Sequence, residues 1–162
     1  MNVTAKARML SLGTLLAIAA PIALASAQAS DPAIGTWELN LAKSTYSAGG
    51  APKSQTRTYV ATAKGYKFTS KGVGADGKPT STEFTVHFDG KYVPVTGNPA
   101  MDSIMVKRVN ASTIKASQKK GNAVAIRTTR VISKDGKTLT STAKGKNAAG
   151  KAYTNVEVFD KK

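Results

Sequence analysis

Turn signals recur along most of this chain at intervals of roughly 8 to 14 residues, and this spacing constrains the fold more than any other feature. Asp-Gly and Gly-Asn pairs supply the positive φ angles that tight hairpins require. The segments between the turns are short and rich in Thr, Val, Ile, Tyr and Phe, which favour strands. We predict strands at residues 35–40, 54–62, 66–73, 80–88, 92–95, 103–110, 113–120, 123–133, 138–146 and 152–159.

About ten short strands joined by tight turns form an antiparallel up-and-down meander, which is typical of an all-β sandwich or barrel. The longest connection, residues 41–53, contains Gly, Ser and Pro, and we predict an ordered surface loop with room for a short helical turn. The Asp-Gly-Lys triplets at Asp76, Asp89 and Asp135 contain one carboxylate each. We therefore interpret these triplets as turns and not as calcium loops.

The N-terminal segment has the order of regions found in a secretory signal peptide. Lys6 and Arg8 precede an apolar run at residues 9–24, and an alanine-rich stretch follows at residues 25–29. An uncleaved membrane anchor is the alternative interpretation. The apolar run is short for a span of about 20 residues, however, and it is interrupted by Ser, Gly, Thr and Pro.

Two overlapping Ala-x-Ala sites allow cleavage after Ala27 or after Ala29, and we favour the second. The prediction is therefore a signal peptide at residues 1–29 and a single domain at residues 30–162 that is periplasmic or secreted. No later segment is apolar enough to span a bilayer, and about 130 residues suffice for one domain. Because the sequence contains no Cys, this domain must rely on its core without disulfides.

The residues that carry most catalytic and metal chemistry are scarce in this chain. Without Cys there is neither a thiol nucleophile nor a thiolate metal site, and the single His87 cannot form a multi-histidine site. The sequence contains neither a Gly-x-Ser-x-Gly nucleophile motif before a helix nor a phosphate-binding glycine loop between a strand and a helix. We therefore expect a protein that is not an enzyme and that uses no metal and no cofactor.

Alternation with period 2 assigns the side chains of each predicted strand to an inner and an outer face. Aromatic residues share the inner face in two segments, and two arginines are in phase with aliphatic neighbours. The inner-face residues that we predict to contact a ligand are Tyr66, Phe68, Phe84, Phe88, Arg108 and Arg130. A bulge that shifts the phase is the alternative, and it would leave both arginines in water.

The first predicted strand contains Gly35-Thr36-Trp37, the last contains residues 156–159, and only hairpins are predicted between them. In this respect the chain resembles the calycins, which are the lipocalins and the intracellular fatty-acid-binding proteins. It resembles most of all the small exported lipocalin-like proteins of bacteria. The resemblance covers nearly all of residues 30–162, and it implies a closed or nearly closed barrel in which Gly35 and Trp37 close one end.

Two departures from the fatty-acid-binding proteins bear on function. Those proteins insert a pair of helices between their first two strands, for which residues 41–53 are too short. They also hold the ligand carboxylate with an Arg and a Tyr on the last strand, where this chain has Glu157 and Phe159. We therefore predict that Glu157 pairs inside the barrel with Arg108 or Arg130, which leaves the other arginine for the acidic group of a ligand.

The chain contains 24 Lys and Arg against 9 Asp and Glu, a net charge of +15. Such a charge attracts anionic partners, of which nucleic acid is the least expected for an exported protein. Our first hypothesis is a binding protein for a small amphipathic or acidic apolar ligand. The alternative is a cell-envelope module that docks an anionic surface or a protein partner through a basic outer face, formed by Lys107, Lys115, Lys119 and Arg127. Solvated strand faces would also explain these four residues.

Overall fold

A computed structural model describes residues 31–162, except residues 49 and 148. The predicted signal peptide, residues 1–29, lies outside the described residues. The described residues form eleven strands and one short 3-10 helix. In chain order these elements are β1 (Gly35–Leu39), η1 (Leu41–Lys43), β2 (Thr45–Tyr46), β3 (Ser54–Thr62), β4 (Gly65–Val73), β5 (Pro79–Val86), β6 (Val93–Pro94), β7 (Ser103–Arg108), β8 (Thr113–Lys120), β9 (Ala123–Ile132), β10 (Thr138–Lys146) and β11 (Ala152–Lys161).

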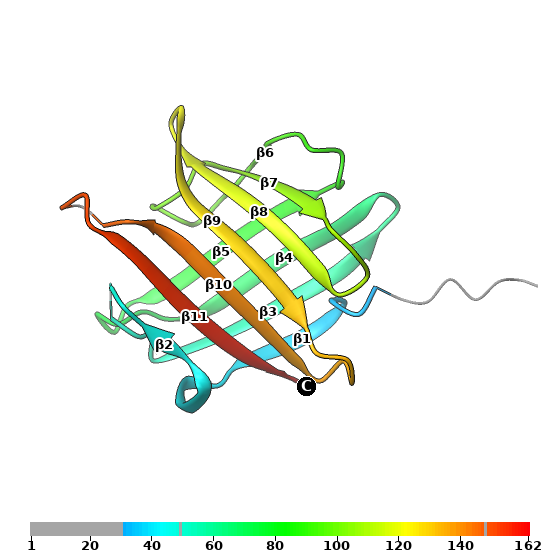
Figure 1. Cartoon of the computed structure of the whole chain (residues 1–162), viewed down its shortest axis with the longest axis horizontal. Coiled ribbons are helices and arrows are strands. Elements are labelled where there is room, and N and C mark those ends of the chain that lie inside the picture. Colours follow the sequence, from blue (N-terminus) through cyan, green and yellow to red (C-terminus); the bar gives the residue numbers. More distant parts are fainter. Residues whose placement is uncertain (1–30, 49, 148) are drawn as a thin grey trace, which may run out of the picture.

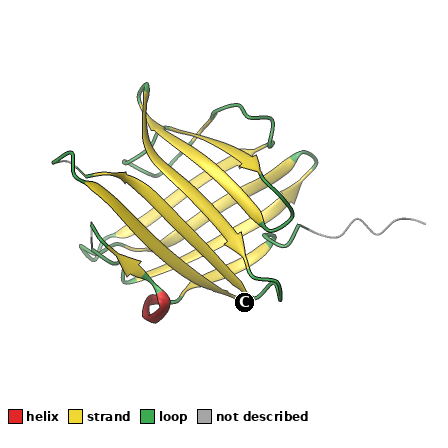
Figure 2. Ribbon diagram, viewed as in Figure 1, coloured by secondary structure: helices red, strands yellow, loops and turns green. Residues whose placement is uncertain are grey.

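The strands belong to one antiparallel sheet that curves round on itself. Ten of them follow one another in the order β5-β4-β3-β1-β11-β10-β9-β8-β7-β6, and β2 pairs with β11 beside this path. Figure 1 shows β3 to β5 behind β8 to β11, and Figure 2 shows that strands make up most of the described structure. The prediction of an all-β antiparallel barrel with about ten strands in its wall is confirmed.

The barrel is nearly closed, because its two edge strands meet at a single bridge. The peptide groups of Glu83 in β5 and Thr96, just after β6, exchange two hydrogen bonds with N to O distances of 3.0 Å. Gly97 follows with a φ of 77°, and a Cβ at this position would lie 2.8 Å from the carbonyl oxygen of Ser81. Glycine therefore lets this segment approach β5 closely enough to form the bridge.

The observed strands agree closely with the predicted ranges. The predictions at residues 54–62, 113–120 and 138–146 match β3, β8 and β10 to the residue. The strand predicted to reach Phe88 ends at Val86 instead. Phe88 has a φ of 54°, a conformation that bulky residues seldom adopt, and the chain turns there while the Phe88 ring still packs against the core.

The connection at residues 41–53 contains η1 and β2. The side-chain oxygen of Asn40 accepts a hydrogen bond from the Lys43 N–H at 3.2 Å and so caps η1. Tyr46 in β2 pairs with Asn155 in β11. The expected short helical turn is present, and η1 is the one helix in the described part of the chain.

A β-bulge between β8 and β9 lies before Arg130 and leaves the orientation of Arg130 unchanged. The pairing register shifts between Gln118 and Lys119, so that Lys119 lies opposite Val124. Val124 is consequently exposed, although strict alternation along the strand from Arg130 would place it on the inner face. The shift precedes Arg130 along β9, so Arg130 keeps its inward phase and is only 6% exposed.

Apolar side chains fill one end of the barrel around Trp37. Trp37 is fully buried, and its indole N–H donates a hydrogen bond to the carbonyl oxygen of Ala33 at 2.8 Å. Gly35 has a φ of 127°, and a Cβ there would lie 3.0 Å from Cε of Lys161, whose ammonium group lies 5.0 Å from the centre of the Trp37 ring. Other buried residues of this core are Tyr59, Val86, Val106, Ile114, Ile132, Leu139 and Phe159.

Candidate functional site

The barrel interior contains a cavity of about 240 Å³ away from Trp37. One part of its wall is apolar: Phe68 in β4 and Phe84 in β5 stack with their ring centres 4.5 Å apart and their planes at 19°. The rest of the wall is mostly polar, and it includes Gln55, Ser70, Gln118, Thr128, Ser141 and Asn155. A ligand with an apolar and a polar part would match this division.

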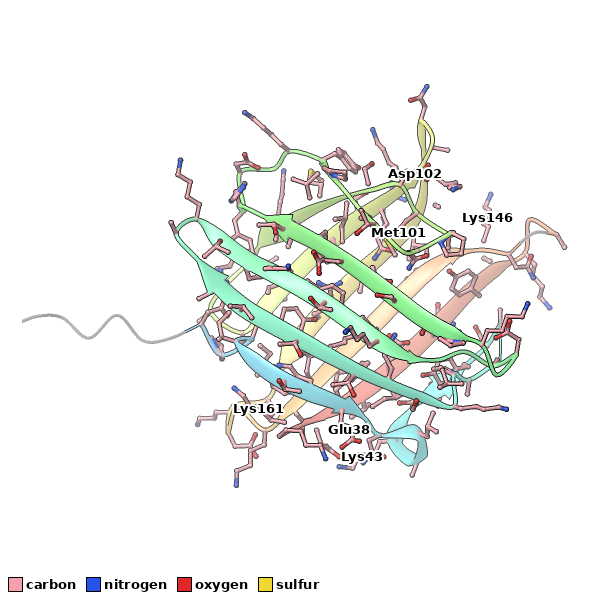
Figure 3. All side chains as sticks on the ribbon, turned by 180° about the vertical axis from the view of Figure 1, so that it is seen from behind. Glu38, Lys43, Met101, Asp102, Lys146 and Lys161 are labelled. Atoms are coloured by element: carbon pink, nitrogen blue, oxygen red, sulfur yellow. The ribbon has the colours of Figure 1, made fainter. Side chains whose placement is uncertain are left out.

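The segment between β6 and β7 borders the cavity through Asn98 and Met101. The Asn98 amide donates a hydrogen bond to the Thr82 hydroxyl at 3.1 Å. Figure 3 shows Met101 and Asp102 beside β5, on the side away from β4. The Asp102 carboxylate accepts a hydrogen bond from the Gly121 N–H at 2.6 Å, which lowers the pKa of Asp102. The segment is therefore tied both to β5 and to the turn between β8 and β9.

Glu157 forms an ion pair inside the barrel, but its partner is Arg57. Nη2 of Arg57 lies 2.5 Å from Oε2 of Glu157, and their side chains are 9% and 16% exposed. The Arg57 guanidinium also lies 4.0 Å from the centre of the Phe159 ring. The predicted ion pair of Glu157 inside the barrel is therefore present, but the prediction of Arg108 or Arg130 as its partner is wrong, because Arg57 lies next to the Glu157 carboxylate.

Arg130 lies in the cavity wall with a neutral partner. Its Nη1 donates a hydrogen bond to the Tyr66 hydroxyl at 3.2 Å, and its guanidinium lies 5.6 Å from the centre of the Phe68 ring. Nε of Arg130 is buried and has no hydrogen-bond partner among the described residues. The ion pairs found in residues 31–162, with 49 and 148 set aside, do not include Arg130.

Tyr66 cannot supply the missing negative charge at neutral pH. Burial raises the pKa of its hydroxyl to about 12, although the neighbouring Arg130 acts in the opposite direction. The lining of the cavity thus holds two guanidinium groups, those of Arg57 and Arg130, and one carboxylate, that of Glu157. One positive charge in the wall is left without an anion, and such a buried charge is costly unless an anion reaches it.

Arg108 lies at the apolar end of the barrel and not in the cavity wall. It forms an ion pair with Asp31, and its guanidinium lies 4.4 Å from the centre of the Phe88 ring. Its side chain is 29% exposed. Of the residues predicted to contact a ligand, Arg108, Tyr66 and Phe88 lie toward the apolar end, whereas the structure gathers Phe68, Phe84 and Arg130 around the cavity, with Glu157 beside them.

The residues predicted to form a basic outer face divide into two groups. Lys107, Lys115 and Arg127 are exposed on the outside of β7, β8 and β9 and line one groove. Lys119 is less exposed, and its ammonium group lies 4.2 Å from the centre of the Tyr92 ring. The structure thus brings three of the four predicted residues together and gives Lys119 an aromatic partner.

Two further properties of the described residues bear on function. In residues 31–162 without 49 and 148, no three His, Cys, Asp or Glu side chains gather in a way that could hold a metal ion. Within the same part of the chain, no helix has the length and apolar character needed to cross a membrane.

Comparisons with known proteins identify the fold and leave the family open. No family model matches this chain, and no curated protein matches it at a significant level. Among solved structures, the zebrafish ileal bile acid-binding protein complexed with cholic acid matches with a TM-score of 0.50 and 15% sequence identity. The match covers 81% of this chain and 99% of that chain. The match confirms the fold alone, a nearly closed antiparallel barrel like that of the bile acid-binding protein.

Proposed function

We propose that this protein is an exported, lipocalin-like binding protein whose barrel holds one small, acidic, amphipathic ligand. The observation that carries the proposal is the position of Arg130, a buried cation in the cavity wall that donates a hydrogen bond to a phenol and forms no ion pair among the described residues. An acidic group of a ligand would accept hydrogen bonds from this guanidinium and neutralise it. Charge-assisted hydrogen bonds of this kind are among the strongest that proteins form.

The other cavity residues support an amphipathic ligand. The stacked rings of Phe68 and Phe84 offer an apolar surface, and Gln118 and Ser141 offer polar groups in another part of the wall. Oε1 of Gln118 is buried without a partner among the described residues, while its Nε2 donates a hydrogen bond to the Thr128 hydroxyl at 2.9 Å. A hydroxyl group on the ligand would satisfy Oε1 as a donor.

The size of the cavity favours a short molecule. A volume of about 240 Å³ lies below the range of about 300 to 1,000 Å³ typical of sites for drug-sized ligands. The zebrafish neighbour was crystallised with cholic acid, an acidic ligand, although at 15% identity the likeness extends to the fold alone. The chemistry of the ligand is therefore inferred from Arg130 and the aromatic wall of this chain.

Export belongs to the same proposal and rests on the N-terminal sequence. Lys6 and Arg8, the apolar run at residues 9–24 and the Ala-x-Ala sites are the features that support it. N-terminal sequencing of the protein recovered from the periplasm or the medium of its host tests this point. A chain that begins at Ser30 or Gln28 is expected, and recovery of an intact Met1 in the membrane fraction would contradict export.

Ligand binding is tested by calorimetric titration with butanoate, octanoate and hexadecanoate, and with 1-octanol as an uncharged analogue. We expect octanoate to bind with a stoichiometry near one and at least about tenfold more tightly than 1-octanol, because only the acid neutralises Arg130. Hexadecanoate should bind more weakly than octanoate, because the cavity is too small to hold its longer chain.

Arg130→Gln and Arg108→Gln form a matched pair for this titration, since each removes one inward-phased guanidinium. Octanoate affinity should fall at least about tenfold in Arg130→Gln and change less than about twofold in Arg108→Gln. Near-ultraviolet circular dichroism checks that both variants keep the packing of the parent. Equal affinity for octanoate and 1-octanol, or equal losses in the two variants, would show that Arg130 does not hold the ligand.

A further inference from the structure

We propose that the outer face of β7 to β10 carries a second binding site, which holds a phosphate-bearing group. Exposed cations from four successive strands line a groove of about 390 Å³ on this face, together with threonine hydroxyl groups. The groove residues that matter are Lys107, Lys115, Arg127, Lys144, Thr129 and Thr142. None of the four cations takes part in an ion pair within the described part of the chain.

The strand register places these cations opposite one another in two pairs. Lys107 in β7 lies directly opposite Lys115 in β8, and Arg127 in β9 lies directly opposite Lys144 in β10. Like charges at directly opposite positions of an antiparallel pair destabilise the sheet. An anion bound between them would remove that repulsion.

Two threonines lie between the two pairs. Thr129 is opposite Lys115 on one side and opposite Thr142 on the other. Arg127 is two residues from Thr129 on the same strand and is therefore a diagonal neighbour of Lys115, at a Cα separation of about 7 to 8 Å. An oxyanion above Thr129 would be within reach of both cations, and the threonine hydroxyl could donate a hydrogen bond to it.

Protection of sheet edges does not explain these charges. Lysines often occupy edge strands, where they prevent pairing with other chains. Here β8 and β9 have neighbours on both sides, so their backbone groups are already paired. On another part of the barrel, the outward Lys67 of β4 is balanced by Glu83 of β5 at 3.0 Å. From residue 103 to residue 146 the sequence contains one acid, Asp135, in the turn between β9 and β10.

The arrangement favours a compact, multiply charged oxyanion over a long polymer. Four cations converge on one groove with hydroxyl groups in its floor, and the guanidinium of Arg127 can bind two oxygens of a phosphate at once. This site is separate from the barrel cavity, because Arg127 points outward and Arg130 inward from the same strand. It therefore does not depend on the proposed function.

Calorimetric titration with inorganic pyrophosphate tests the site. The titration is done at about 0.15 M salt, because at this ionic strength charges that are more than about 8 Å apart are largely screened from each other. The parent is compared with Lys115→Gln/Arg127→Gln and with the control Lys64→Gln/Lys71→Gln, which removes two exposed cations outside the groove. We expect saturable binding near one to one. Affinity should fall at least about tenfold in the groove variant and stay within about twofold in the control.

A second arm measures retention on vesicles of phosphatidylglycerol and phosphatidylcholine against vesicles of phosphatidylcholine alone. Retention that the groove variant loses and the control keeps assigns the phosphate to a lipid headgroup, whereas binding of pyrophosphate alone assigns it to a soluble phosphate ester. Without ligand, the groove variant should melt no lower than the parent, because it removes both like-charge pairs.

The proposal is overturned if neither pyrophosphate nor the anionic vesicles bind in a saturable way. It is equally overturned if the two double variants lose affinity to the same extent, since this would reflect the net charge alone. Arg130→Gln should retain the pyrophosphate affinity of the parent, and a loss of pyrophosphate binding in that variant would place the anion in the barrel cavity instead of the groove.

Discussion

Arg57 and Glu157 stabilise each other inside the barrel, and either residue alone would leave a poorly hydrated charge there. Breaking a buried ion pair costs about 3 to 5 kcal/mol, whereas replacing both partners with apolar residues is often close to neutral. We expect Glu157→Met to lower the free energy of unfolding by about 3 kcal/mol. The double variant Arg57→Met/Glu157→Met should recover most of this loss in urea denaturation. Additive losses in the double variant would show that the two residues are not coupled.

Trp37 is the largest side chain of the apolar end, and it is buried together with its one polar atom. Replacing a large buried aromatic residue with alanine removes its contacts and leaves a cavity, at a cost of about 3 to 5 kcal/mol. We expect Trp37→Ala to lose about this much stability in thermal or urea unfolding, and Trp37→Phe to lose less. Unfolding curves of Trp37→Ala that coincide with those of the parent would mean that this end does not depend on Trp37.

Tyr66 should make the stability of the fold sensitive to alkaline pH. Burial raises its pKa from 10.0 to about 12, so the folded state favours the neutral hydroxyl. The contribution of Tyr66 to stability is therefore fully present below pH 10 and is lost as the pH rises toward 12. In urea unfolding between these values, Tyr66→Phe should show a shallower decline than the parent. Tyr46, whose pKa burial also raises to about 12, offers Tyr46→Phe as a comparison. Identical slopes in the parent and Tyr66→Phe would assign the decline to other groups.

Among the strands, the junction between β5 and β6 is the weakest part of the barrel wall. Among the described residues, one two-bond backbone bridge links Glu83 in β5 to Thr96, just after β6, whereas β3 and β4 pair over nine positions. Backbone amides protected by few neighbouring bonds exchange through local opening. We expect the amides of Glu83 and Thr96 to exchange hydrogen for deuterium faster than that of Phe68 in β4, as followed by nuclear magnetic resonance. Equal protection would show that the wall opens only as a whole.

The strands could be predicted well because their signals are local. Turn residues and β-branched segments fix where a hairpin begins and ends, and β3, β8 and β10 agree with the predicted limits. Two local features were beyond this reasoning. The bulge near Lys119 depends on the pairing between β8 and β9, which a local pattern does not contain. The turn at Phe88 requires a left-handed backbone conformation, and the residue at this position is not a glycine, which would have indicated it.

The interior charges show a sharper limit of sequence analysis. Arg130 could be assigned to the interior because aliphatic residues in β9 share its phase. Arg57 could not, since it shares its face of β3 with Gln55, Tyr59 and Ala61, a mixture of polar and apolar residues, and the other face carries Ser, Thr and Val, so that the alternation marks neither face clearly as apolar. The partner of Glu157 depends on which strands meet across the barrel, and period-2 alternation carries no such information.

At the scale of the whole molecule, the barrel interior is divided between an apolar core and a largely polar cavity. The apolar residues around Trp37 form a core at one end, and the cavity beyond it is lined by Arg130 and by core residues such as Phe68 and Phe84. Gln118 and Ser141 are buried polar residues that line the cavity and lie outside the apolar core. Replacing the cavity residue Arg130 should therefore lower octanoate affinity more than Lys115→Gln/Arg127→Gln on the outer face, which leaves the interior unchanged.

The net charge of the chain leads to a last prediction, on the effect of salt. Surface ion pairs such as Lys67–Glu83 weaken when salt screens them, and each contributes up to about 1 kcal/mol. Repulsion among 24 cations facing only 9 acids is screened as well, and it acts in the opposite direction. Because the cations greatly outnumber the acids, we expect the repulsion to dominate, so that raising sodium chloride from about 0.01 to 0.5 M increases the melting temperature by a few degrees.

The double variant Lys115→Gln/Arg127→Gln provides the control for the salt effect. Lys115 and Arg127 each lie directly opposite another cation, whereas Lys64 and Lys71 do not. The groove variant therefore loses more repulsion than the control Lys64→Gln/Lys71→Gln. We expect its melting temperature to rise less with salt than that of the control. Each double variant removes two cations, so the comparison separates repulsion between the opposed cations of the groove from the effect of net charge. A melting temperature that falls with salt in the parent would mean that the ion pairs outweigh the repulsion, and that the excess of cations is spread too widely over the barrel to strain any one strand pair.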